Sequence, residues 1–174
     1  MSVEIVKVYK QEVPALRFIG KKYRDSDRVN GSFGKYWGDW DKNGWWDIVK
    51  KQSVIDIKDL CEDLDAGIGL MREKNGEPFE YWIGLFMPEK TPVPEGFEYH
   101  DFNKMVLGVC WIHGKMPEIL EKEKDCYAKL LNEGYEVIND KENILWFFER
   151  CVHPRFFTPD EKGEIILDIC FYVR

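Results

Sequence analysis

The stretch Ile144-Leu145-Trp146-Phe147-Phe148-Glu149-Arg150-Cys151-Val152 places one carboxylate within a run of apolar and aromatic side chains. It predicts a β-strand, in which side chains alternate between two faces, so Phe147 and Cys151 share the face of Glu149. A carboxylate with such neighbours must pair with a cation, accept hydrogen bonds or take up a proton, because an isolated buried charge is costly. Glu149 therefore either belongs to a functional site or lies on a solvated face of an edge strand.

The composition is that of a soluble globular protein with a high content of aromatic side chains. Of the 174 residues, 44% are hydrophobic, 33% are charged and 15% are aromatic, including seven tryptophans. A chain of this length buries about 70% of its unfolded surface, so it has room for a core and a cavity. We expect a single domain over residues 1–174.

The net charge of −7 argues against the basic surface that nucleic-acid binding requires, so we expect no direct contact with nucleic acid. No run approaches the roughly 20 apolar residues of a membrane helix, and the N-terminus shows no signal sequence. These features predict a cytoplasmic protein that does not enter a membrane. Its oligomeric state does not follow from the sequence.

The cysteines and histidines show none of the close spacings that are typical of metal sites. No Cys-x-x-Cys pair occurs, and the histidines lie far apart, so we interpret the cysteines as reduced core thiols and expect neither a metal nor a cofactor. The residues are Cys61, Cys110, Cys126, Cys151 and Cys170, with His100, His113 and His153.

The first half of the chain predicts strands, a helix and then two strands. Residues 3–9 and 14–23 have strand patterns, and aromatic residues at helical intervals follow Ser32, the expected N-cap. Asn43-Gly44 interrupts this helix before an apolar stripe resumes toward Lys51. The turn signal Lys74-Asn75-Gly76-Glu77 joins predicted strands at 66–73 and 79–87.

The second half predicts the same order of elements. Residues 104–112 form a predicted strand, and Pro117 suits the first turn of a helix over 118–132 that Gly134 ends. Two more strands are predicted at 143–152 and 164–173.

A repeated β-α-β-β unit predicts an α+β fold with pseudo-twofold symmetry and a groove between its halves, where pockets are often found. Repeat one spans about 3–87, a Pro-rich crossover spans 88–103, and repeat two spans about 104–174. The acidic segment 53–65 is expected to be a short helix or flexible insert that takes no part in chemistry.

Several motifs together resemble the GyrI-like small-molecule-binding domain, also called the bacterial AraC-type effector-binding domain. They are YWIGLF at 81–86, PVPEGFEY at 92–99, FER at 148–150, PRF at 154–156 and IILDI at 165–169. The resemblance extends over nearly the whole chain, from about residue 3 to residue 173.

The resemblance implies a duplicated β-α-β-β fold whose antiparallel sheet curves like a barrel, with helices packed on it. Family members bind bulky aromatic or cationic compounds in a hydrophobic pocket with a glutamate at its base, and the matching residue is Glu149. Because no segment is left for a helix-turn-helix DNA reader, we expect a standalone member that senses or sequesters a drug or toxin.

Aromatic side chains would form the walls of such a pocket. A cation gains about 0.5–2 kcal/mol from each cation–π contact, and Glu149 would supply the opposite charge. Each tryptophan taken singly could instead belong to the core, but four of them near Gly38 would surround a helix on several sides. The expected ligand-binding residues are Glu149, Tyr36, Trp37, Trp40, Trp45, Trp46, Tyr81, Trp82, Tyr99, Trp111, Trp146 and Phe147.

Two alternatives use the same fold differently. A subgroup of the family hydrolyses the strained cyclopropane ring of DNA-alkylating natural products, and in that case Glu149 would act as the acid or base. Tyr81 is the expected hydroxyl partner, and Tyr36 and Tyr99 are the other candidates. Other members resemble gyrase-inhibitory proteins, which implies a protein partner rather than a ligand. Turnover distinguishes the enzyme from the binding protein.

Overall fold

Eight β-strands form one antiparallel sheet in residues 3–174, the part of the chain that the computed structural model describes. The strand order is β1-β6-β8-β7-β3-β4-β2-β5, and every neighbouring pair is antiparallel. The strands are β1 (Glu4–Val13), β2 (Leu16–Arg24), β3 (Gly67–Glu73), β4 (Glu80–Pro88), β5 (Glu98–Phe102), β6 (Met105–Gly114), β7 (Leu145–Cys151) and β8 (Ile165–Val173).

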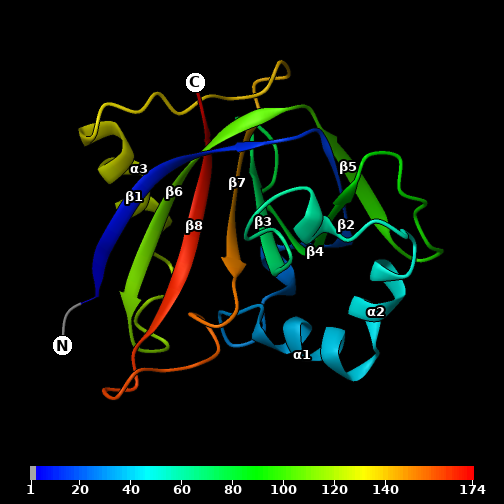
Figure 1. The fold of residues 1–174 in the computed structure, drawn as a ribbon, viewed down its shortest axis with the longest axis horizontal. Coiled ribbons are helices and arrows are strands. Elements are labelled where there is room, and N and C mark those ends of the chain that lie inside the picture. The colour runs from blue at the N-terminus through cyan, green and yellow to red at the C-terminus, as the bar shows by residue number, and fades with distance from the viewer. Residues whose placement is uncertain (1–2) are drawn as a thin grey trace.

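Three α-helices accompany this sheet in the described part of the chain. They are α1 (Gly34–Lys42), α2 (Trp45–Lys50) and α3 (Glu123–Asn132). Figure 1 shows α3 at one end of the molecule and the α1–α2 pair at the other, with strands between them. Gly44 separates α1 from α2 in the left-handed conformation that glycine adopts readily, with φ at 66°, as the Asn43-Gly44 signal predicted.

The predicted α+β class and antiparallel sheet are confirmed, and each strand predicted from the sequence is present with shifted ends. The neighbours β6-β8-β7 and β2-β4-β3 occupy corresponding places in the two halves of the strand order, as a duplicated unit would require. Duplication and barrel-like curvature stay predictions. No helix in residues 3–174 is both long and apolar enough to cross a membrane.

Three local predictions need correction. The helix predicted over 118–132 begins only at Glu123, because Glu121 has a φ of 60° that an α-helix cannot accommodate. Ser32 is not the N-cap of α1: Phe33 holds that position, and the Ser32 hydroxyl accepts a hydrogen bond from the Gly34 amide. The end of the crossover forms β5, which the sequence pattern did not predict.

Alternation along the central strands gives the sheet an apolar core on each face. On β7, Phe148 packs on one face with Phe18 and Phe86, whereas Phe147 packs on the other with Phe171. Segment 53–65 covers the first face, where Ile57, Cys61 and Leu64 join the core. It contains a short 3-10 helix at Ile57–Asp59, which agrees with the short helix predicted there, and it packs against the sheet rather than forming a loose insert. The second face carries the helices and the candidate site.

Candidate functional site

A cavity of about 1290 Å³ lies between the α1–α2 pair and α3, above strands β3, β4, β7 and β8. This volume exceeds the roughly 300–1,000 Å³ of an ordinary small-molecule pocket, so a bulky ligand fits. Much of the wall is aromatic, with rings that come from all three helices or the loops beside them and from the sheet. These residues are Phe33, Trp37, Trp46, Phe79, Tyr81, Tyr127, Phe147, Phe156, Phe157 and Phe171.

Glu149 stands in the wall of this cavity at the centre of the sheet. It lies on β7 between Gly69 of β3 and Ile169 of β8, so its strand is internal rather than the edge strand of the solvated alternative. Burial raises the pKa of the Glu149 carboxyl to about 7, the Tyr81 hydrogen bond opposes this rise, and the charge of Glu123 adds to it. The group therefore exchanges its proton near neutral pH.

A chain of hydrogen bonds fixes the orientation of Glu149. The Tyr81 hydroxyl donates to Oε1 of Glu149, and it accepts a hydrogen bond of 2.9 Å from Nε1 of Trp37. Phe33 lies flat against the Tyr81 ring, with 4.3 Å between centroids and 2° between planes. Burial and the neighbouring carboxylate hold the pKa of Tyr81 well above 10, so the phenol keeps its proton and acts as the donor.

Gly69 makes room for this hydrogen bond. A Cβ at this position would lie 2.5 Å from the Tyr81 hydroxyl and 2.6 Å from Oε1 of Glu149, closer than real side chains approach. Gly67, two residues earlier on the same face of β3, lies close to aromatic rings, although less tightly: a Cβ there would be 3.1 Å from Trp37 and 3.2 Å from Trp46. Glycine thus forms the floor beneath the aromatic walls.

The cavity is acidic as well as aromatic. Glu123, in the first turn of α3, is half-buried in the wall, and burial raises the pKa of its carboxyl. The charges that line the cavity favour a cationic ligand, because like charges gathered in a cleft focus a potential of one sign. Its acidic residues are Asp25, Asp41, Asp65, Glu73, Glu121, Glu123 and Glu149, and its basic residues are Arg28, Lys50 and Lys124.

Five of the residues predicted to bind a ligand line this cavity. Trp37 and Trp46 reach it from the helices, and Tyr81, Phe147 and Glu149 reach it from the sheet. The two tryptophans come from α1 and α2, and their rings lie 5.9 Å apart. The aromatic, carboxylate-containing pocket expected from the sequence thus has a counterpart in the structure.

Three of the predicted tryptophans lie on strands but face away from the cavity, so their expected role in the wall is wrong. Trp82 and Trp146 belong to the core of the opposite face, and Trp111 packs against that core. The cause is strand alternation, because Trp82 follows Tyr81 and Trp146 precedes Phe147.

The other four predicted residues also lie outside the wall. Trp40 is fully buried behind Trp46, with 4.5 Å between their ring centroids, and Trp45 packs edge-on against Trp40. The Tyr36 hydroxyl instead donates a hydrogen bond to the Asp27 carbonyl. Tyr99, on β5, is exposed, and the guanidinium of Arg17 from β2 lies over its ring. These residues support the helices and the sheet edge.

Several wall residues were missed by sequence reasoning, although two carry a detectable signal. Phe33 precedes Trp37 by four residues, the spacing that places two side chains on one helical face. Phe171 lies directly opposite Phe147 in the pairing of β7 and β8. Glu123 and the loop residues Phe156 and Phe157 have no such signal, because their position depends on the tertiary fold.

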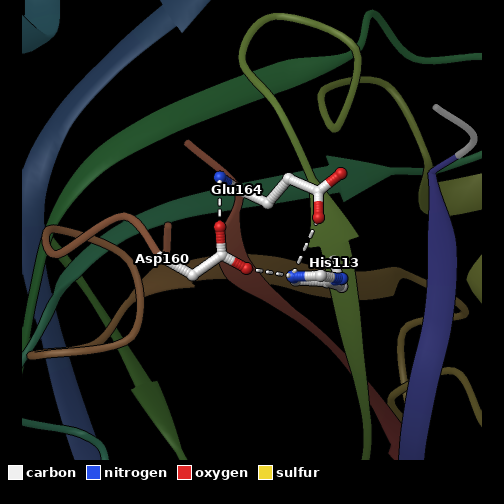
Figure 2. Close-up of side chains that lie close together, drawn as sticks. All are labelled: His113, Asp160 and Glu164. Carbon is white, nitrogen blue, oxygen red and sulfur yellow. Dashed lines mark hydrogen bonds and ion pairs between the residues drawn. The ribbon is translucent and has the colours of Figure 1, made fainter. Parts of the chain in front are cut away.

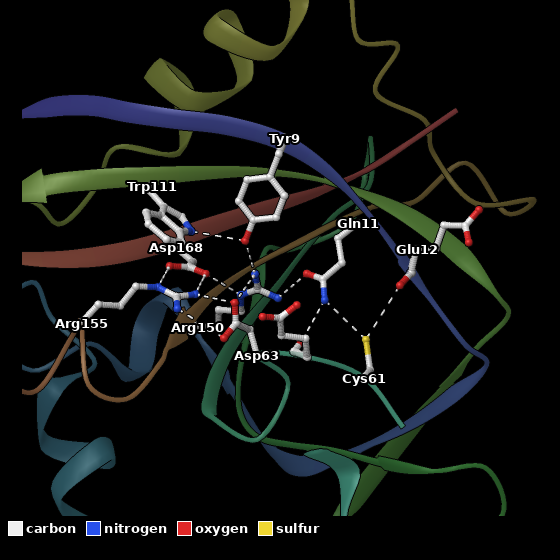
Figure 3. Close-up of polar contacts among 10 residues, drawn as sticks. Tyr9, Gln11, Glu12, Cys61, Asp63, Trp111, Arg150, Arg155 and Asp168 are labelled. Atoms are coloured by element: carbon white, nitrogen blue, oxygen red, sulfur yellow. Dashed lines mark hydrogen bonds and ion pairs between the residues drawn. The ribbon is translucent and has the colours of Figure 1, made fainter. Parts of the chain in front are cut away.

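Arg150, the residue after Glu149, points to the opposite face and does not neutralise it. Its guanidinium donates to Oδ2 of the buried Asp168 at 2.6 Å and to Gln11 and Tyr9 at 2.9 and 3.0 Å. Figure 3 shows these groups together with Arg155, which also binds Asp168. The buried arginine is therefore satisfied within the scaffold.

Asp63 completes this network from segment 53–65, to which the sequence analysis assigned no chemistry. Arg155 donates from Nη2 to Oδ2 of Asp63 at 2.9 Å and also lies over the Trp111 ring (Figure 3). Two arginines thus meet two aspartates, so the charges balance. Through Asp63 the segment takes part in holding the fold, and its last residue, Asp65, lines the cavity.

No protein-family model matches the sequence, and a search of curated proteins finds no match. Solved structures do share its fold. The structure of SAV2435 bound to tetraphenylphosphonium matches with a TM-score of 0.67 at 13% identity, over 97% of this chain and 94% of that one. The EcmrR C-terminal domain matches with a TM-score of 0.60 at 9% identity, over 97% of both chains. A hydrolase from Listeria innocua matches with a TM-score of 0.50 at 10% identity, over 97% of this chain and 92% of that one.

SAV2435 and the EcmrR C-terminal domain are GyrI-like effector-binding domains. This chain has the fold of that class of protein, so the resemblance drawn from its sequence motifs is confirmed at the level of architecture. At such low identity the matches establish the fold alone.

Proposed function

We propose that this protein binds a bulky, hydrophobic, aromatic cation in the cavity between the α1–α2 pair and α3, with Glu149 as its charge partner. The observation that carries the proposal is a carboxylate at an aromatic cavity wall with no ion pair to any lysine or arginine in residues 3–174. A cationic ligand would supply the missing charge and gain contact with the rings.

The comparisons support this choice of ligand class. SAV2435, which has the same fold, binds tetraphenylphosphonium, a cation that carries its charge inside four aromatic rings. The wall here offers rings from several directions, including Trp37, Tyr81 and Phe147, and a rim rich in carboxylates. A standalone role in sensing or sequestering such compounds is consistent with this arrangement.

Binding of tetraphenylphosphonium tests the proposal and should depend on pH. A cation binds the ionised form of Glu149, whose pKa is about 7, so affinity should rise with pH through 7 and then level off. Below pH 7 the dissociation constant should increase by up to about tenfold per pH unit, because the carboxyl must first lose its proton. Isothermal titration calorimetry between pH 5.5 and 8.5 measures this.

Triphenylphosphine oxide, a neutral compound with similar rings, serves as the control ligand. Its affinity should not rise with pH, because no charge on Glu149 is needed to bind it. If tetraphenylphosphonium does not bind, or binds with the same affinity at every pH, the charge-pairing proposal is wrong.

Gly69→Ala should weaken tetraphenylphosphonium binding about tenfold. The added methyl group would displace the Tyr81 hydroxyl and the Glu149 carboxylate, and a hydrogen bond to a charged group contributes roughly 1.5–3 kcal/mol. Calorimetry at pH 8 gives the affinity. Gly38→Ala, where the new Cβ has no neighbour within 4 Å, is the matched control and should bind as the wild type does. Equal affinity of both variants would mean that the orientation of Glu149 is unimportant.

Hydrolysis of a strained ring is the second candidate function, and the environment of Glu149 favours it. A carboxyl with a pKa near 7 that is hydrogen-bonded to a tyrosine suits general acid or base catalysis, and the Listeria hydrolase shares the fold. Incubation with a cyclopropane-bearing alkylator, followed by mass spectrometry for the product of water addition, tests this function. Product formed at the same rate by Glu149→Gln would exclude Glu149 as the acid or base.

A further inference from the structure

Three side chains that can bind a metal point toward one another near the end of β6, and none of them lines the cavity (Figure 2). His113 lies near the end of β6, Glu164 directly precedes β8, and Asp160 belongs to the loop between β7 and β8. Nε2 of His113 is 3.3 Å from Oδ2 of Asp160 and 3.6 Å from Oε2 of Glu164. All three ligand atoms lie within 4.8 Å of one another.

The Asp160 carboxylate is held in place by the loop itself. Its Oδ1 accepts hydrogen bonds from the backbone amides of Lys162 and Glu164, at 2.8 and 3.0 Å. These bonds leave Oδ2 directed at His113, as Figure 2 shows. Oδ1 of Asp160 thus holds the loop through hydrogen bonds, and Oδ2 is available to a ligand.

Glu164 supplies an independent sign that the cluster accepts a ligand. Only 6% of this residue is exposed, and its carboxylate receives no hydrogen bond from any residue in 3–174. Its one ionic neighbour is His113 at 3.6 Å, which carries charge only when it is protonated. The nearly buried Glu164 thus presents carboxylate oxygens that no protein donor occupies, and a metal ion beside His113 would pair their charge.

We propose that His113, Asp160 and Glu164 bind a divalent transition-metal ion such as Zn²⁺. Three ligands at about 2.0–2.1 Å from a tetrahedral zinc stand roughly 3.3 Å apart, close to the two separations from His113. The imidazole favours zinc and its first-row neighbours over Mg²⁺ and Ca²⁺, which prefer oxygen ligands alone. Water would complete the coordination.

The sequence predicts no metal site, because these ligands lack the close spacing of a zinc motif. His113 and Asp160 are 47 residues apart, and they meet only because β6 pairs with β8. A ligand set assembled from one strand and a distant loop has no local signature in the sequence.

Zinc titration of the purified protein, without a histidine tag, tests the site. Calorimetry should show one strong site per chain, and Asp160→Asn should weaken it at least tenfold. Asn keeps an oxygen for the two backbone amides but presents an amide to His113, so the loop retains its turn. Glu164→Gln should have a similar effect. His153→Gln removes a histidine outside the cluster and should leave zinc affinity unchanged.

Cobalt substitution supplies a second readout. The absorption spectrum of the Co²⁺ protein should lack thiolate charge-transfer bands, since all five cysteines lie outside the cluster. Absence of strong zinc binding in the wild type, equal affinity in Asp160→Asn, loss of affinity in His153→Gln, or thiolate bands would each overturn the proposal.

Discussion

Replacing Glu149 with glutamine is expected to raise the dissociation constant for tetraphenylphosphonium about a hundredfold at pH 8. The amide keeps the shape of the side chain and an oxygen that accepts the Tyr81 hydrogen bond, but it removes the charge that meets the cation. Loss of one partner of a desolvated charge pair costs about 2–5 kcal/mol, and each 1.4 kcal/mol is a factor of about ten. Isothermal titration calorimetry measures the change.

Two controls separate the specific charge from general effects. Triphenylphosphine oxide should bind Glu149→Gln about as well as it binds the wild type, because its contacts are with rings. Glu73→Gln removes an exposed carboxylate elsewhere in the lining, and this variant should weaken cation binding only slightly. Equal losses for the cation and the neutral compound would contradict the proposed role of Glu149.

Replacing Asp168 with asparagine is expected to lower the free energy of unfolding by about 3–5 kcal/mol. This change leaves the shape of the side chain but strips the fully buried Arg150 of its closest counter-charge, and breaking one side of a buried ion pair has this cost. The loss is large beside the roughly 5–15 kcal/mol that stabilises a typical domain. Urea denaturation followed by circular dichroism measures it.

Asp101→Asn is the matched control for this prediction. Asp101 also accepts two hydrogen bonds from one arginine, Arg17, at 2.7 and 2.8 Å, but 56% of its side chain is exposed. An exposed pair of this kind contributes about 0–1 kcal/mol. If Asp168→Asn is no more harmful than Asp101→Asn, the buried network does not stabilise the fold as proposed.

The elements of the fold could be predicted because they depend on local patterns. The runs that became β4, β7 and β8 are strongly apolar, and Gly44 marks the break between helices through its own conformational freedom. The start of α3 was harder to place, since the pattern of apolar residues continues across 118–132. The positive φ of Glu121 sets the start of α3, because this backbone conformation cannot belong to an α-helix.

The candidate site could be predicted only in part. Glu149 was found because a carboxylate is unusual among apolar residues, and strand alternation from it selects Phe147 and excludes Trp146. The same alternation places Trp82, which follows Tyr81, on the face opposite the cavity. By contrast, Glu123 reaches the cavity from a helix, and no local pattern brings it toward Glu149.

Neighbouring residues on β7 place two ionisable groups on opposite sides of one sheet. Arg150 is bound by the scaffold, whereas Glu149 accepts a hydrogen bond from Tyr81, its one partner among residues 3–174, and faces the cavity. Under the proposed function, selectivity would depend on Glu149 and folding on Arg150, so mutation at position 149 would alter which compounds are accepted while the architecture persists. Directed evolution of this pocket toward neutral or anionic guests should start from that residue and leave its neighbour untouched.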